Sequence, residues 1–392
     1  MKTQYIFATL MVFALVSCKG IVTYKTDLPD LTANHGAPTI EAIYDIYDDA
    51  METPLEEGSL AQLLHIKGEN LAKPRSITFN GIEADLSKCY CETSDGYVIV
   101  PRVLPENVDN KLVYTTSEGS TTYTFSVTIP QFKLEGLKNE FALPGSTVAV
   151  NGDFFDLFQF GVEGSDASIK TDDGTEVEVA SVSEEGMSIV IPEGTPDNSF
   201  LTFSWTDVTL GPQTKKIPYR QTSALLMGDF SNTGFWDDGL KAKHLSSGNF
   251  DGDPEYLGYP FFRFNDSYGA WTWNSIGMGD GFPLDYDWAT MMDKLVFKME
   301  IWTDPSKPIP AYTGNCGVFL QFNLKANVPV NLGGAAYNTG GEWKTYSCPL
   351  ADVASEMPAK GDYWGFAFTI QPPSDWSLNC AFANFRIEPA SY

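Results

Sequence analysis

Histidine and basic side chains are both scarce in this sequence, and each shortage excludes a class of function. Only three histidines occur among 392 residues, and they lie far apart. A His-dependent nucleophilic site therefore has little material to be built from. Lysine and arginine total 25 against 51 acidic residues, which gives a formal net charge of −26. Because phosphate binding needs clustered basic side chains, nucleic acid is excluded as a partner, and a neutral ligand is favoured over a polyanion.

Cysteine is also too scarce for a disulfide framework or a zinc site. Five cysteines follow Cys18, an odd number, and Cys89 and Cys91 are too close in sequence for an easy bridge. No Cys/His pattern has zinc spacing. The acidic run 251–255 lacks the spacing of an EF-hand and is predicted to be a solvated turn. We therefore predict neither a metal nor a cofactor.

Long hydrophobic runs are missing as well. The apolar run Tyr5–Val16 is too short to span a bilayer as a helix, which needs about 20 residues, and is typical of a secretory signal. It ends in Leu-Val-Ser-Cys at residues 15–18, which resembles the lipobox of bacterial lipoproteins. The resemblance implies a signal peptide over residues 1–17, an acylated Cys18 and a lipid-anchored linker over 18–36. The alternative is an ordinary cleaved signal with an incidental cysteine.

The sequence does contain many short runs in which apolar and polar residues alternate, bounded by Gly, Pro, Asn and Asp. Residues 121–127 and 201–205 are examples. This period of two residues is typical of half-buried β-strands, and the abundant Val, Thr, Phe and Tyr fit such pleated surfaces. An all-β fold is predicted.

A repeat of roughly ninety residues divides the first part of the chain. In both copies Gly-Ser precedes a strand, at residues 58 and 145. A Val-Pro or Ile-Pro pair follows, at residues 100 and 191. Each copy closes with Ile-Pro, at residues 129 and 217. The period suits one small β-sandwich per copy. The pattern resembles the immunoglobulin-like IPT/TIG family, which implies one domain over residues 37–130 and a second over 131–222 that space or stiffen the protein.

Tryptophan is distributed very unevenly. Of nine tryptophans, only Trp205 lies in the repeats, and eight follow residue 223. A sandwich core needs only a few, so the excess predicts a further β-sandwich domain over residues 223–392 that carries the function.

The end of this domain supplies a second resemblance. Its strand at 381–387 contains Asn-Phe-Arg-Ile, and residues 343–350 form a Trp-led strand that ends in Pro-Leu. Both resemble jelly-roll carbohydrate-binding modules. In the order lipobox, tandem repeats and jelly roll, the chain resembles the surface glycan-binding lipoproteins of Gram-negative polysaccharide-utilisation systems. The resemblance implies a non-catalytic protein at the surface of the outer membrane, held by an acylated cysteine. Its implied partners are a neutral polysaccharide, namely a β-glucan or a related hemicellulose such as xyloglucan, and a glycan transporter complex.

Indole rings explain why tryptophan would serve such a ligand, since the flat face of a β-linked sugar stacks on an aromatic ring. Trp271 and Trp273 are two residues apart, so on a strand they would share one face. The two rings could both pack in the core or could together form a flat ligand-binding surface, a platform, and we predict the platform. The other candidate ligand-binding residues are Trp302, Trp376, Trp236, Asn274 and Arg263.

Each of these candidates has a reason. Trp236 and Trp376 stand in loop sequences, and Trp302 ends a strand. Asn274 offers both donors and an acceptor. Arg263 would offer planar donors to sugar hydroxyls, unless it is an ordinary surface arginine.

Two other functions remain open from the sequence. The aromatic residues could dock a protein, as in a cell-surface adhesin. A glycoside hydrolase would need a carboxylate pair, but 51 acidic residues allow any pair to be imagined and single out none. We therefore predict that the protein is not an enzyme.

Overall fold

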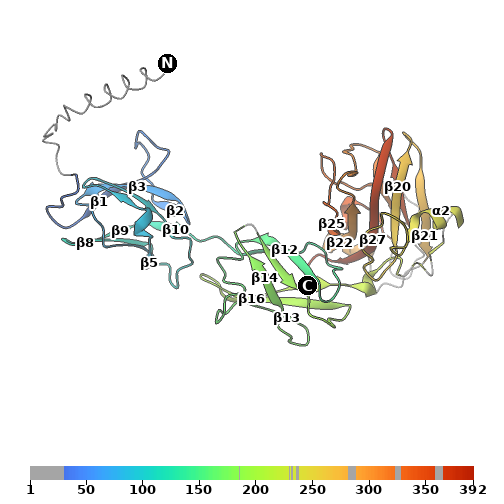
Figure 1. Ribbon diagram of the computed structural model, residues 1–392, viewed down its shortest axis with the longest axis horizontal. Coiled ribbons are helices and arrows are strands. Elements are labelled where there is room, and N and C mark those ends of the chain that lie inside the picture. Colours follow the sequence, from blue (N-terminus) through green and yellow to red (C-terminus); the bar gives the residue numbers. More distant parts are fainter. Residues whose placement is uncertain are drawn as a thin grey trace, which may run out of the picture. The chain divides into compact units, whose positions relative to one another are not determined.

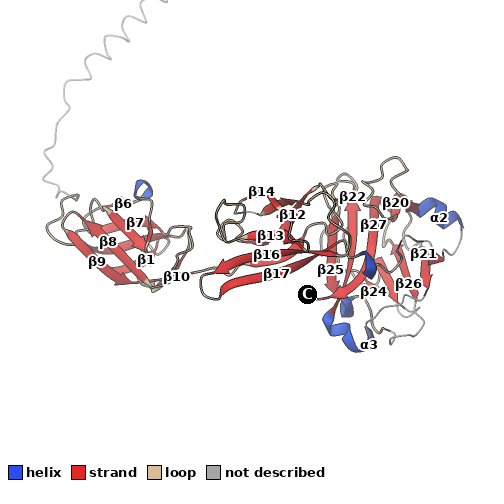
Figure 2. Cartoon of the chain, turned by 90° about the horizontal axis from the view of Figure 1, so that it is seen from below, coloured by secondary structure: helices blue, strands red, loops and turns tan. Residues whose placement is uncertain are grey.

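The computed structural model describes residues 31–392, except 185, 229, 231–232, 235–237, 281–287, 323–327 and 358–364. The lipobox and Cys18 therefore lie outside the described residues. The chain divides into two compact units, Met1–Ile129 and Pro130–Tyr392 (Figure 1). Figure 2 shows that strands dominate and that the helices are short. No helix in the described part of the chain is both long and apolar enough to cross a membrane.

The first unit contains one β-sandwich, called here the first sandwich. Its two four-stranded antiparallel sheets enclose apolar side chains from both, among them Ile66, Ile77, Val98 and Leu112. A parallel pair, β10 and β2, lies beside them. The elements are β1 (Thr39–Asp45), β2 (Glu57–Ser59), β3 (Leu63–Glu69), β4 (Ser76–Phe79), β5 (Ile82–Glu83), η1 (Leu86–Lys88), β6 (Tyr90–Cys91), β7 (Asp95–Ile99), β8 (Lys111–Thr116), β9 (Gly119–Thr124) and β10 (Ser126–Thr128).

The second unit begins with another small sandwich, the second sandwich. A four-stranded sheet in the order β11-β12-β15-β14 accompanies a three-stranded sheet in the order β13-β16-β17. The elements are β11 (Lys133–Leu137), β12 (Thr147–Asp153), β13 (Ser168–Thr171), β14 (Glu178–Val182), β15 (Met187–Val190), β16 (Ser199–Asp207) and β17 (Gly211–Tyr219), followed by η2 (Thr222–Ala224).

The C-terminal sandwich has two five-stranded sheets, which we name after their central strands. The β26 sheet has the order β18-β21-β26-β23-β24, and the β27 sheet has the order β19-β20-β27-β22-β25. The strands are β18 (Thr233–Gly234), β19 (Leu245–Ser246), β20 (Phe261–Tyr268), β21 (Asn274–Asp280), β22 (Leu295–Thr303), β23 (Gly317–Phe322), β24 (Val328–Pro329), β25 (Lys344–Pro349), β26 (Gly365–Gln371) and β27 (Trp376–Pro389). The helical elements are α2 (Asp238–His244), α3 (Trp288–Met291), η3 (Met292–Lys294) and η4 (Leu350–Asp352).

Strand periodicity explains how this sandwich is filled. Alternate side chains of each strand point between the sheets, where phenylalanines from both gather, including Phe262, Phe264, Phe297, Phe366 and Phe368. Each such burial contributes about 1.5–3 kcal/mol. The intervening residues point outward, so each sheet presents one outward face. The prediction of an all-β protein with immunoglobulin-like sandwiches and a larger C-terminal sandwich is confirmed.

The outward face of the β27 sheet is covered by the second sandwich. Phe141 of the second sandwich packs in one buried cluster with Phe261, Trp343, Ala381 and Ala383. These last four residues lie outside the main core, on the outward side of the β27 sheet or beside it. We call this contact region the junction.

Candidate functional site

Two exposed indoles stand on the turn that joins β20 to β21. Trp271 is 60% exposed and Trp273 is 56% exposed. Among the tryptophans whose side chains the structure describes, these two alone are exposed. They lie in the turn before β21, which begins at Asn274. Their shared exposure therefore comes from the turn and not from the strand periodicity that the sequence led us to expect.

The turn is fastened to the loop between β26 and β27. The Trp271 amide donates to the Pro372 carbonyl at 2.8 Å, and the Ala270 amide donates to Asp375 Oδ1 at 2.9 Å. Gln371 Nε2 donates to the Trp271 carbonyl at 3.4 Å. Two exposed rings are thus held in place by hydrogen bonds to the backbone around them.

Trp271 adopts a backbone conformation that tryptophan rarely takes. Its φ is +61°, in the left-handed region, where a residue other than glycine costs about 1–2 kcal/mol. Glycine would occupy this turn freely. Such strain gathers at functional sites, where the surrounding structure holds it, so a bulky ring at this position points to a role for the ring itself.

Trp273 connects the turn to the outward face of the β26 sheet. Its ring stacks on Phe319, with centroids 6.1 Å apart and an interplanar angle of 24°. Phe319 stands in one row with Thr369 and Ser275 across three neighbouring strands. The two hydroxyls lie 2.6 Å apart. Phe319 is only 3% exposed and serves as the support for the Trp273 ring. We call the exposed pair, Trp271 and Trp273, the indole platform.

Polar side chains lie beside the indole platform. Asn274 is half-buried, and its Nδ2 donates to the Ile370 carbonyl at 3.1 Å. Gln321 and Gln371 belong to the same outward face, because their strand neighbours Phe322 and Ile370 point into the core. Aromatic faces beside amides and hydroxyls can stack on sugar rings and hydrogen-bond their hydroxyls. The structure thus brings together three of the candidates from the sequence, Trp271, Trp273 and Asn274.

The prediction that Trp376 is an exposed loop residue is wrong. Trp376 is the first residue of β27 and is only 3% exposed. It pairs with Tyr268 across the sheet and lies 5.9 Å from the Tyr312 ring. The loop sequence ends one residue earlier, at Asp375, so Trp376 already has the alternation of a strand and points into the core.

Trp302 and Arg263 belong to the opposite face of the sandwich. Both are on the outward side of the β27 sheet, so no single platform includes them and Trp271. Trp302 is half-buried, and its Nε1 donates to the Gly341 carbonyl at 2.8 Å.

Arg263 is engaged within the protein and not presented to a ligand. Its Nε lies 2.6 Å from Asp253 Oδ1, and its guanidinium stands over the Phe250 ring, 4.7 Å from the centroid. Asp253, in the acidic run 251–255, is therefore the ion-pair partner of this arginine. Trp236 lies outside the described residues.

Sequence reasoning missed Phe319, the ring that supports Trp273. The alternation of residues 317–322 contained the signal for Phe319, since Val318 and Leu320 point into the core and Phe319 must point outward. Within the described residues, no group of His, Cys, Asp and Glu is arranged to hold a metal ion.

Comparison with known families identifies the domain that carries the indole platform. Residues 219–389 match the family model of the surface glycan-binding protein B xyloglucan binding domain. The C-terminal sandwich is a surface glycan-binding domain. The predicted function class, non-catalytic glycan binding at the cell surface, agrees with this family and is confirmed.

Solved structures of surface glycan-binding proteins are also similar to the chain. That of Prevotella bryantii is 16% identical over 91% of this chain and 100% of its own, with a TM-score of 0.49. One from a complex xyloglucan utilization locus of Bacteroides uniformis is 16% identical over 90% and 99%, with a TM-score of 0.47. One from the Bacteroides ovatus mixed-linkage glucan utilization locus is 13% identical over 89% and 74%, with a TM-score of 0.25. No curated protein matches the chain. The assignment of the glycan-binding domain rests on the family match.

Proposed function

We propose that this protein captures xyloglucan or a related β-glucan on the indole platform. The observation that carries the proposal is the exposure of Trp271 and Trp273 on a fastened turn within the glycan-binding domain. The family description supplies xyloglucan as the ligand class. Extended β-linked chains present flat sugar faces, which suit a shelf of this kind.

The expected affinity is modest. Each aromatic contact adds about 0.5–1.5 kcal/mol beyond the burial of area, and each hydrogen bond to a sugar hydroxyl adds about 1 kcal/mol. The two exposed rings with about three polar contacts would give roughly −4 to −6 kcal/mol, which is binding in the millimolar to tens-of-micromolar range. Such binding lets a polymer be captured and passed on, while engagement of several sites adds avidity.

The decisive experiment is affinity electrophoresis on gels that contain xyloglucan, mixed-linkage glucan, xylan or mannan. The wild-type protein should be retarded by a β-glucan without release of reducing sugar. The double variant Trp271→Ala/Trp273→Ala should lose roughly 10- to 100-fold in affinity. Tyr47→Ala, which removes a 91% exposed ring from the first sandwich, is the matched control and should bind as wild type. If the double variant is retarded as strongly as the wild-type protein, the proposal is wrong. It is also wrong if no glycan retards the wild-type protein and the protein captures another protein instead.

We also propose that the acylated Cys18 anchors the chain to the outer membrane. In this arrangement, the tandem immunoglobulin-like domains over residues 37–130 and 131–222 hold the binding domain away from the membrane, and a glycan transporter complex receives the polysaccharide. The lipobox sequence supports the anchor. Cys18→Ala should move the expressed protein from the detergent-rich to the aqueous phase in a detergent-partition assay. Persistence in the detergent phase would contradict acylation at this residue.

A further inference from the structure

A second aromatic site is built into the junction between the second and C-terminal sandwiches. A cavity of about 510 Å³ lies there, with Trp302 and Trp343 on the side of the C-terminal sandwich. Thr147, Ala149 and Ser188 line the side of the second sandwich. We call this cavity the junction slot. Its volume falls within the range of about 300–1,000 Å³ that is usual for small-molecule sites.

We propose that the junction slot is a second glycan-binding subsite, which holds a short stretch of the same neutral polysaccharide that the indole platform captures. The inference rests on the proposed function for the nature of the ligand. It goes further by giving the second sandwich a part in binding, where the sequence suggested only a spacer. Three features of the slot support it: the fixed junction, the aromatic wall and the polar wall.

The junction is fixed, so the slot exists before any ligand arrives. The Thr345 amide donates to the Lys138 carbonyl at 2.8 Å, and the Glu140 amide donates to Thr345 Oγ1 at 2.8 Å. From the second sandwich, Arg220 Nη1 reaches the Leu257 carbonyl at 3.0 Å. A preformed site spends less binding free energy on ordering its walls.

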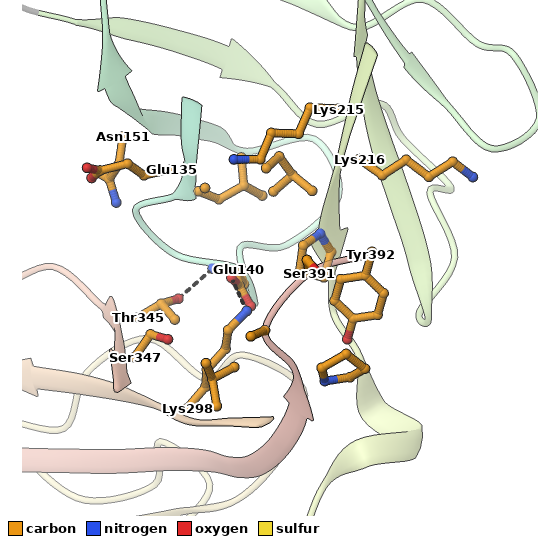
Figure 3. Close-up of a pocket in the computed structure, with 17 residues that line it drawn as sticks. Glu135, Glu140, Asn151, Lys215, Lys216, Lys298, Thr345, Ser347, Ser391 and Tyr392 are labelled. Carbon is orange, nitrogen blue, oxygen red and sulfur yellow. Dashed lines mark hydrogen bonds and ion pairs between the residues drawn. The ribbon is translucent and has the colours of Figure 1, made fainter. Parts of the chain in front are cut away.

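A buried charge cluster strengthens this junction, and Figure 3 shows one of its ion pairs, that of Glu140 with Lys298. Arg386, fully buried, lies 2.9 Å from Glu300, 2.7 Å from Glu388 and 2.7 Å from Glu140. Lys298 bridges Glu140 at 2.8 Å and Glu388 at 3.1 Å. Only Glu140 comes from the second sandwich, so this carboxylate ties the two sandwiches together.

Burial and charge oppose each other within the cluster. Burial raises the pKa of Glu300 even though Arg386 acts against it. Burial alone would raise the pKa of Glu388 as well, but Arg386 and Lys298 outweigh it and lower that pKa. Because unpairing any of these charges in the interior is costly, the cluster resists separation of the two sandwiches.

The aromatic wall of the slot is held in one orientation. Trp302 Nε1 donates to the Gly341 carbonyl and Trp343 Nε1 donates to the Glu255 carbonyl, each at 2.8 Å. Both indole N–H groups are therefore occupied. Trp302 packs against the buried junction cluster yet stays half-buried and lines the slot, so its ring surface is what it offers to a ligand. An aromatic surface without a free donor suits the C–H face of a sugar.

The opposite wall is small and polar. Ala149 and Ser188 are paired across β12 and β15, and Thr147 lies two residues along the same strand. The hydroxyls of Thr147 and Ser188 make no hydrogen bond with any described residue, so both are free for sugar hydroxyls. At the rim, Lys138 and Glu342 neutralise each other as an ion pair. A neutral hydroxylated ligand therefore fits this slot better than an ion does.

Titration calorimetry with a xyloglucan oligosaccharide tests the inference in the full chain. In the platform variant Trp271→Ala/Trp273→Ala, residual binding should remain, weaker than wild type by at least about tenfold. Adding Ser188→Trp should fill the slot and remove this residual binding. Ala149→Phe fills the slot from the neighbouring strand and should do the same. The matched control is Thr206→Trp, at an exposed strand position of the second sandwich, which should leave the residual binding intact.

The outcomes separate the two proposals. Loss of all binding in the platform variant alone overturns the slot and upholds the platform. Residual binding that survives both slot variants also overturns the slot. If the platform variant binds as wild type but both slot variants abolish binding, the slot is upheld and the platform fails. Thermal unfolding of each variant shows that the fold is intact.

Discussion

The two outward faces of the C-terminal sandwich make opposite use of similar residues. On the β26 sheet, Trp271 and Trp273 stand exposed on a turn. On the covered side of the β27 sheet, Trp302 is half-buried and Trp343 is 6% exposed, and both pack at the junction. Trp271 and Trp273 are thus exposed in full view of solvent, whereas Trp302 and Trp343 pack at the junction and keep only the surface that lines the junction slot. We therefore expect that removing the buried charges of the junction lowers stability, and that removing the exposed indoles lowers glycan binding without lowering stability.

The largest expected effect is on the covered face. Arg386→Ala would leave Glu300 and Glu388 buried with fewer cationic partners, which should cost about 3–5 kcal/mol in the free energy of unfolding. Urea unfolding followed by tryptophan fluorescence would measure it. Lys170→Ala removes an exposed ion pair of the second sandwich with Glu176 and should leave the midpoint unchanged. An unchanged midpoint for Arg386→Ala would show that the stability of the covered face does not depend on these buried charges.

The next effect is on the exposed indoles. Trp273→Ala should weaken glycan binding about two- to tenfold, with the unfolding midpoint lowered only slightly, because the ring is mostly exposed and its loss uncovers Phe319 alone. Calorimetry and thermal unfolding on one preparation would measure both. A large loss of stability would place Trp273 with the packing tryptophans instead.

Trp271→Gly sharpens the comparison further. It should also weaken binding about two- to tenfold. Its stability should not fall, because glycine relieves the strain at φ +61°. The same calorimetry and unfolding measurements apply, with Trp271→Ala as the control that removes the ring without relieving the backbone. If Trp271→Gly binds as wild type, the strained ring has no part in the site.

A smaller effect is expected where the platform is fastened. Asp375→Ala removes the acceptor for the Ala270 amide, so the turn should loosen and binding should fall about two- to fivefold, which corresponds to the roughly 0.5–1 kcal/mol of a hydrogen bond. Asp375→Asn keeps an acceptor oxygen and should restore binding in the same assay. Equal losses in the two variants would show that charge, and not positioning, is what Asp375 contributes.

The smallest effect is that of pH. The indole platform is made of rings and amides that do not titrate, so glycan binding should be flat between about pH 5 and 8. Asp95 in the first sandwich, a group that does titrate, provides a contrast to this flat pH dependence. Burial alone would raise the pKa of Asp95, but hydrogen bonds from Lys67, Ser94 and His65 outweigh it and lower the pKa to about 2.

The lowered pKa of Asp95 sets the pH range over which this carboxylate stabilises the fold. Because the folded pKa of Asp95 lies below the ordinary value of about 3.9, its stabilisation is present above about pH 4 and is lost as the pH falls toward 2. The stability difference between wild type and Asp95→Asn should therefore shrink over that range in acid unfolding. Glycan binding that follows the same curve would contradict a platform without titrating groups.

Much of the fold and part of the site could be predicted from local pattern. Alternation over residues 201–205 predicted a strand, and β16 spans them. The crowding of tryptophan after residue 223 pointed to the domain that matches the glycan-binding family. Trp271 and Trp273 were found by the same reasoning, although their exposure depends on a turn that hydrogen bonds with residues about a hundred positions away.

The sequence by itself determined the strands, the acidic and histidine-poor character and the place where aromatic residues accumulate, because these follow from composition and a period of two residues. Only the tertiary structure decided which indoles stay exposed. Strand periodicity assigns a side chain to one of two faces but does not say what covers that face. Glu140 and Arg386 are 246 positions apart in sequence and form an ion pair between the second sandwich and the β27 sheet. This long-range packing covers the side of the sheet that carries Trp302, so Trp302 is half-buried while Trp271 and Trp273 are exposed.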